Sequence, residues 1–235
     1  MEGFSFLYDA VVEAWHLMLG WDRQVLSATT ISLRVSMLAT LLCTIVGLPI
    51  GLLLATRRFR GRQLTITLLN TMMAIPTVVI GLFVYSLLTR RSLFGSMDLL
   101  FTQTAMVIGQ TMLGLPLLIS LTASAFNSLD RSVRDTAITL GADRVRIWTT
   151  MIWEGRFALV AAVSATFGRL IGEVGIAMLV GGNIAGQTRN ITTALALETS
   201  KGEFSRAMAL GIILLLLALC VNFLLRYFQG RGETS

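Results

Sequence analysis

Residues 181–188, GGNIAGQT, have nearly the spacing of a phosphate-binding loop. That loop follows the pattern G-x-x-x-x-G-K-[ST], and Gly181, Gly186 and Thr188 occupy three of its defined positions. Gln187 stands where the loop needs the lysine that reaches the phosphates of a nucleotide. A long apolar run, typical of a membrane helix rather than of a buried strand, precedes the segment. The pattern therefore does not predict that this chain hydrolyses ATP.

Arg169 and Glu173 carry opposite charges four residues apart within an apolar run, and this spacing allows an ion pair on one face of a helix. Placing one such residue at the centre of a membrane helix costs about 2.5 to 3.5 kcal/mol. We therefore expect the pair to face the protein interior. Two roles stay open, since the pair either lines a passage for an anion or only braces the helix bundle.

Other catalytic or metal-binding clusters are not indicated. His16 is the one histidine, which excludes sites built from several histidines, and Cys43 and Cys220 both lie inside apolar runs. We interpret the two cysteines as small buried apolar residues. No cofactor or metal is expected on this chain.

The composition places the chain in a membrane. Of its 235 residues, 54% are hydrophobic and 14% are charged, whereas soluble domains have about 25% charged residues. Apolar runs long enough to cross a bilayer occur at residues 31–56, 64–89, 104–126, 157–181 and 206–228. Five spans are therefore predicted. The basic residues cluster beside these runs, so the formal charge of +6 indicates membrane topology and not a nucleic-acid partner.

Arginines between the runs predict the orientation. One group separates the first two runs and another the third and fourth: Arg57, Arg58, Arg60 and Arg62, and Arg131, Arg134, Arg144, Arg146 and Arg156. The positive-inside rule puts both groups in the cytoplasm. The N-terminus is then outside and the C-terminus cytoplasmic. We expect residues 1–24 to form an interfacial helix with aromatic anchors, and a sixth span is the alternative.

With this orientation residues 181–203 lie on the outer face, where no ATP is available. Polar donors suited to contact a binding protein or an incoming anion occur there: Asn183, Thr188, Arg189, Asn190, Thr192 and Thr193. The alternative is a solvated loop.

Pro49, Pro76 and Pro116 fall in the first three spans, where each is expected to bend or break its helix. These kinks either serve packing alone or shape a passage that opens and closes.

Residues 127–156 are predicted to form two short amphipathic helices on the cytoplasmic side. Leu129, Val133, Ala137 and Leu140 make one apolar stripe, and Val145, Trp148 and Ile152 continue a second stripe after Gly141. A glycine between two helices permits a sharp turn. We expect this turn to insert into a partner's cleft, and a helix pair resting on lipid is the alternative.

The segment DTAITLG, residues 135–141, resembles the E-A-A-x-x-x-G loop in membrane subunits of ABC importers. Asp135, Ala137 and Gly141 match its acidic, small and glycine positions, with Leu140 and Arg144 beside them, whereas Thr136 replaces the middle alanine. Residues 168–215 resemble the same region of tungstate permeases and, more distantly, molybdate and sulfate permeases. The resemblance extends over about residues 27–225.

This resemblance implies one all-α transmembrane domain, residues 1–235, with the bundle of a type I ABC importer permease. It implies a homodimer that binds two ABC ATPase subunits, which hold ATP and Mg²⁺, and an extracytoplasmic oxyanion-binding protein. The chain would then perform no covalent chemistry and would translocate an oxyanion by alternating access. Tungstate is the expected substrate, with molybdate or sulfate as alternatives. A non-ABC channel or a membrane enzyme is the competing class.

Overall fold

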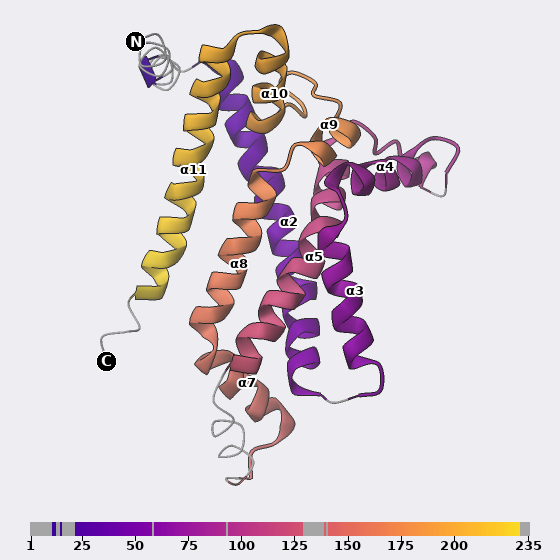
Figure 1. Cartoon of the computed structure of the whole chain (residues 1–235), viewed down its shortest axis with the longest axis vertical. Helices are drawn as coiled ribbons and strands as arrows, with labels where there is room; N and C mark the ends of the chain where they lie inside the picture. The colour runs from indigo at the N-terminus through magenta and orange to yellow at the C-terminus, as the bar shows by residue number, and fades with distance from the viewer. Residues whose placement is uncertain are drawn as a thin grey trace.

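The computed structural model describes residues 11, 12, 15, 22–57, 59–92, 94–128, 139 and 141–230. In chain order the principal helices are α2 (Arg23–Thr56), α3 (Arg62–Ala74), α4 (Thr77–Leu88), α5 (Gln103–Ser128), α7 (Arg144–Glu154), α8 (Arg156–Ile171), α9 (Gly175–Gly181), α10 (Ile191–Lys201) and α11 (Phe204–Gly230), with a short 3₁₀ helix at Gly95–Met97. Figure 1 shows α2, α3, α5, α8 and α11 as upright rods, with α10 at one end and α7 at the other. The predicted all-α class is confirmed.

Helix α2 begins at Arg23 and not at residue 31 as predicted. The Asp22 carboxylate accepts a hydrogen bond from the Gln24 N–H at 2.8 Å and caps the helix. With 34 residues, α2 is about 51 Å long and exceeds a hydrocarbon layer of ~30 Å. The predicted interfacial segment 1–24 therefore overlaps α2 at its end. The rest of that segment lies almost wholly outside the described residues.

Two glycines let α2 pack closely on α5. A Cβ on Gly51 would lie 2.6 Å from Thr122 Cβ, and one on Gly47 would lie 3.3 Å from Leu118 Cδ2. Such Gly-x-x-x-Gly pairs are common where membrane helices approach closely. Pro49 lies between them and Pro116 lies within α5, and both helices continue past their prolines without a break. Of the expected bend or break, the break is therefore absent at both positions.

The second predicted span, residues 64–89, is not one helix. It consists of α3 and α4, which meet at an angle of 96°, so that α4 projects sideways from the bundle (Figure 1). Proline has no N–H to donate and disfavours a helical conformation in the residue before it. Ile75 accordingly has an extended backbone and Pro76 precedes the first turn of α4. The predicted disruption at Pro76 is confirmed.

The fourth predicted span, residues 157–181, is also divided. Helices α8 and α9 meet at 58° across a break that contains Gly172, Glu173 and Val174. Glycine weakens a helix interior because it loses the most backbone freedom on folding. Within the described part of the chain, α2, α5 and α11 are each long and apolar enough to span a membrane, and the two bent pairs bring the number of candidate spans there to five. This agrees with the predicted number.

The core lies where α2, α5, α8 and α9 meet. Its fully buried side chains include Val35, Met106, Leu118, Leu170 and Ile176. Cys43 is buried in this core, as expected. Cys220 is exposed on α11, so its predicted burial is wrong. It lies on an outer face of large exposed apolar side chains, Leu216, Leu219 and Phe223 among them, and such a face suits lipid.

Candidate translocation and coupling sites

Arg169 and Glu173 form the ion pair that their spacing predicts. Arg169 Nη1 donates to Glu173 Oε2 at 2.9 Å, and the side chains are 44% and 3% exposed, respectively. The pair does not lie on one continuous helix, because Arg169 is in the last turn of α8 and Glu173 lies in the break before α9. Cations are favoured at the C-terminal end of a helix. The arginine therefore suits its position and keeps nearly half of its surface exposed.

Glu173 also stabilises the start of α9. Its second carboxylate oxygen, Oε1, accepts a hydrogen bond from the Ile176 N–H at 3.3 Å, one of the backbone donors that a helix start leaves unpaired. Its carbonyl oxygen accepts from Thr192 Oγ1 at 2.8 Å. Glu173 thus has a structural role, while Arg169 has a side chain available to a ligand.

The two helix breaks lie against each other. A Cβ on Gly175, at the start of α9, would lie 2.9 Å from Thr77 Oγ1 at the start of α4, and 3.4 Å from Glu173 Oε1. Farther along, a Cβ on Gly81 would lie 2.8 Å from Leu179 Cδ1. Helices α4 and α9 therefore pack together from their first turns. Sequence reasoning missed this junction, although the glycines at both positions were a usable signal.

Residues 181–188 fold into a closed loop. Thr188 Oγ1 donates to the Gly181 carbonyl at 2.5 Å and accepts from the Ile184 N–H at 3.0 Å. The N–H groups of residues 187–189 all point to the Ile184 carbonyl. A phosphate-binding loop directs such N–H groups at its ligand. Here they are used within the loop, which agrees with the rejection of a nucleotide site.

Arg189 belongs to a different site from Arg169. Its Nε donates to Asn183 Oδ1 at 3.1 Å and its Nη2 to the Asn183 carbonyl at 3.2 Å. It also lines a shallow pocket between α2, α10 and α11, together with Gln24, Glu198 and Arg206. The loop therefore holds Asn183, Thr188 and Arg189, and Arg189 also lines the pocket. Arg169 lies elsewhere, at the α8–α9 break.

Part of the predicted outer loop is a buried helix. Asn190 caps α10: its side chain accepts from the Thr193 N–H at 2.9 Å, while Thr193 Oγ1 accepts from the Asn190 N–H at 3.1 Å. The Ile191 N–H donates to Ser32 Oγ of α2 at 2.9 Å. Asn190, Thr192 and Thr193 are buried. The expectation that these three residues meet an external partner is wrong, because their polar groups hold α10 in place.

Helix α7 is attached to three upright helices at once. Its buried Met151 packs with Leu52 of α2, Phe126 of α5 and Leu159 of α8, and the half-buried Ile147 and Trp148 join the same cluster. Val145 and Ile152 are exposed, so the predicted stripe is correct for Trp148 and wrong for these two residues. Helix α7 therefore packs against the ends of α2, α5 and α8.

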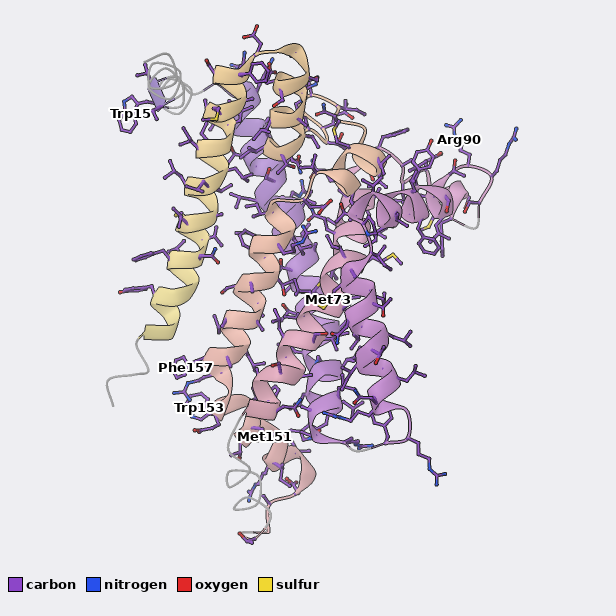
Figure 2. All side chains as sticks on the ribbon, viewed as in Figure 1. Trp15, Met73, Arg90, Met151, Trp153 and Phe157 are labelled. Atoms are coloured by element: carbon purple, nitrogen blue, oxygen red, sulfur yellow. The ribbon has the colours of Figure 1, made fainter. Side chains whose placement is uncertain are left out.

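The turn before α7 is only partly described. Asp135, Ala137 and Leu140 lie outside the described residues, and of Arg144 the backbone alone is described, as the first residue of α7. Gly141 has φ +73°, and no atom of the described residues lies within 4 Å of the position that a Cβ would occupy. At the other end of α7, Arg156 Cζ lies 4.6 Å from the centre of the Trp153 ring and 4.4 Å from that of Phe157. Figure 2 shows Trp153 and Phe157 at this end of the bundle, near Met151.

Comparisons with known proteins identify relatives over most of the chain. Residues 47–232 match the family model described as binding-protein-dependent transport system inner membrane component. The chain is 40% identical to a probable anion ABC transporter permease protein of Haloferax volcanii, over 88% of this chain and 91% of that protein. It is 36% identical to the tungstate uptake system permease protein TupB of Campylobacter jejuni, over 94% of this chain and 92% of that protein.

Among solved structures, an amino acid ABC transporter has a similar fold, with a TM-score of 0.70. This match covers 91% of the present chain and 96% of the other chain, with 17% sequence identity. The similarity supports the type I importer bundle expected from the sequence, because the helical arrangement is shared over nearly the whole length of both chains.

Proposed function

Because the chain belongs to the family of binding-protein-dependent transport system inner membrane components, it is the membrane permease subunit of an ABC importer, and we propose that it translocates the oxyanion tungstate. The chain is a transport subunit and not an enzyme, and the ATPase of such an importer is a separate subunit. This family membership excludes the alternatives of a self-contained channel and a membrane enzyme.

The observation that carries the substrate proposal is the similarity to the tungstate permease over nearly the whole chain. Arg169 is the side chain we assign to the passage, since it lies at a break between two membrane helices and its guanidinium is partly exposed. A cation there lowers the barrier for an oxyanion. The Glu173 carboxylate offsets part of the arginine's charge, which favours release of the anion over tight retention.

We assign the working importer two copies of this chain, two ATPase subunits that hold ATP and Mg²⁺, and an extracytoplasmic oxyanion-binding protein. Each chain has a single segment suited to an ATPase, residues 127–156, so two copies are needed to engage two ATPases. We propose that this segment and the C-terminus are cytoplasmic and the N-terminus is outside, which the arginine-rich connections support.

The proposed cycle begins when the paired ATPases close and displace α7. Met151 and Trp148 pass this displacement to α2, α5 and α8. The breaks at Pro76 and at Gly172–Val174 divide two spans into segments that are able to change their relative tilt. The passage around Arg169 then alternates between outward and inward openings.

Uptake of labelled tungstate by vesicles that contain the importer tests the substrate. We expect excess unlabelled tungstate to abolish uptake, molybdate to compete weakly and sulfate least. If sulfate competed as strongly as unlabelled tungstate, the importer would have a general specificity for oxyanions and not a specificity for tungstate. A stronger effect of molybdate than of tungstate would make molybdate the substrate.

A further inference from the structure

Helix α3 has three faces of different character. Ile66 and Leu69 pack against Leu54 of α2 and against Ile119 and Ala123 of α5. A second face exposes Leu64, Leu68 and Met72 at four-residue intervals. A third face exposes Gln63, Thr67, Asn70, Thr71 and Ala74. Residues separated by three, four, seven and eight positions lie on the same side of a helix, so the polar residues of the third face form one continuous stripe.

This polar stripe does not suit lipid. The outer faces of α2 and α11 carry large apolar residues: Met37, Leu38, Leu41, Leu42, Ile45 and Val46 on α2, and Leu215, Leu216, Leu219, Phe223 and Leu224 on α11. On α3 the second face, Leu64, Leu68 and Met72, has the same character. Polar side chains within membrane segments face a protein interior or a water-filled cavity. The stripe therefore points away from lipid.

Asn70, near the middle of α3, and Gln63, at its start, are the side chains of this stripe that keep carboxamide donors available. Thr67 Oγ1 donates to the Gln63 carbonyl at 3.0 Å and Thr71 Oγ1 to the Thr67 carbonyl at 2.8 Å, both within α3. In the described part of the chain the Asn70 carboxamide, which is exposed, has no hydrogen-bond partner. A carboxamide offers two N–H donors without a charge.

The stripe runs toward the Arg169–Glu173 pair. Helix α3 has 13 residues and is about 20 Å long, and it ends at the break before Pro76. At that break Thr77 Oγ1 lies against Gly175, and Gly175 is close to Glu173. The polar face thus leads from the end of the bundle near α7 to the layer that contains Arg169.

We propose that the polar face of α3, Gln63, Thr67, Asn70 and Thr71, lines the cytoplasmic half of the oxyanion's passage, with Asn70 as the neutral donor that the anion meets after Arg169. This inference rests on the proposed function. A neutral donor replaces part of the hydration of an anion without the strong attraction of a second cation, so it allows the ion to leave.

Reactivity of single cysteines tests the position of the face. The test uses the complete importer with its ATPases in inside-out vesicles, in a Cys220→Ser background, with a charged, water-soluble thiol reagent. Asn70→Cys and Thr67→Cys are expected to react at least tenfold faster than Leu68→Cys and Met72→Cys, which lie on the lipid face within about 3 Å of the same depth. The parent, which keeps the buried Cys43, gives the background rate.

Two outcomes overturn the inference. In one, the cysteines on the two faces react at equal rates in every nucleotide state. In the other, Asn70→Cys resists the reagent but forms a disulfide between two copies of the chain, which would make the stripe a dry contact between subunits. Because the reagent reports water access and not substrate, this experiment gives its answer even if the chain transports an anion other than tungstate.

Uptake measurements test the role of Asn70 itself. Asn70→Leu is expected to lower the uptake rate about fivefold, since the donors of the carboxamide are lost, and Asn70→Asp more than tenfold because a carboxylate repels the anion. Asn70→Gln keeps the carboxamide and should retain most of the uptake, and Leu68→Ala serves as a matched control with unchanged uptake. Equal uptake by the Leu, Asp and parent forms would overturn the assignment, provided that all bind the ATPase equally.

Discussion

Thr77 and Gly175 bring the breaks of two different membrane helices into contact, and the space between them admits no side chain on residue 175. A Cβ there would lie 2.9 Å from Thr77 Oγ1 and 3.2 Å from Val78 Cγ2. The same junction holds the Glu173 carboxylate. Movements of the α3–α4 pair and of the α8–α9 pair are therefore coupled at this point.

Gly175→Ala is expected to destabilise the protein by about 1 to 3 kcal/mol, the usual cost of adding atoms to a packed contact. The thermal midpoint of the purified importer measures this loss. Thr77→Ala in the same chain should restore part of the stability because it removes the nearest atom, Oγ1. Gly172→Ala is the matched control, since the nearest atom to its Cβ is 3.9 Å away. A destabilisation by Gly172→Ala as large as that by Gly175→Ala would contradict the contact.

Substitutions of the ion pair should separate stability from transport. Glu173→Gln and Arg169→Gln each leave one charge without its partner, and each is expected to lower stability by about 1 to 3 kcal/mol. The double variant has no unpaired charge and should regain stability relative to both single variants. Its uptake should stay low, because the cation near the passage is absent. Thermal midpoints and labelled-anion uptake together check this, and normal uptake by the double variant would show that Arg169 only braces the bundle.

Gly141→Ala should weaken binding of the ATPase. The backbone at Gly141 has φ +73°, where an L-residue costs about 1 to 2 kcal/mol, although there is open space for a Cβ. The turn that we assign to the ATPase contact would therefore change shape. The measurement is the amount of ATPase that copurifies with the permease.

Gly202→Ala provides the control for that prediction. Gly202 has φ +84°, and among the described residues no atom lies within 4 Å of its Cβ position, so the strain is similar. It lies at the opposite end of the bundle, after α10 (Figure 1). Copurification should be unchanged. If both variants lost the ATPase equally, general misfolding and not the turn would be responsible.

Gly51→Ala should loosen the crossing of α2 and α5. The added Cβ would lie 2.6 Å from Thr122 Cβ and 2.9 Å from the Ile119 carbonyl oxygen, and backbone atoms do not move aside easily. We expect a loss of about 1 to 3 kcal/mol in stability, measured as a lower thermal midpoint. Gly211→Ala on α11, where the nearest atom is the flexible Leu195 Cδ1 at 3.5 Å, should leave the midpoint unchanged or slightly raised.

Several features could be predicted locally. The lengths of the apolar runs predicted five candidate spans, and the spacing of Arg169 and Glu173 predicted their ion pair. Pro76 predicted a disruption because a proline disturbs the turn of the helix in which it lies. At Pro49 and Pro116 the expected bend or break does not take the form of a break, since α2 and α5 both continue past their prolines.

Other features depend on contacts between distant parts of the chain. The donors Asn190, Thr192 and Thr193 looked suited to an external ligand, but Ser32 and Glu173 lie close enough to use the polar groups of this segment internally. Val145 and Ile152 fitted an apolar stripe, yet Met151 is the residue that contacts the bundle. A periodic pattern gives the residues on each face of a helix and not the neighbour that each face meets.

The sequence by itself determined that this chain is a membrane protein with an arginine and a glutamate inside its fourth apolar run, because hydrophobic length and residue spacing are properties of short segments. Only the tertiary structure decided that this pair lies at a helix break, that the break touches a second one at Thr77, and which face of α3 suits lipid. These relations arise from the packing of segments far apart in the chain, where close approach depends on small residues such as Gly51, Gly81 and Gly175 meeting a particular partner.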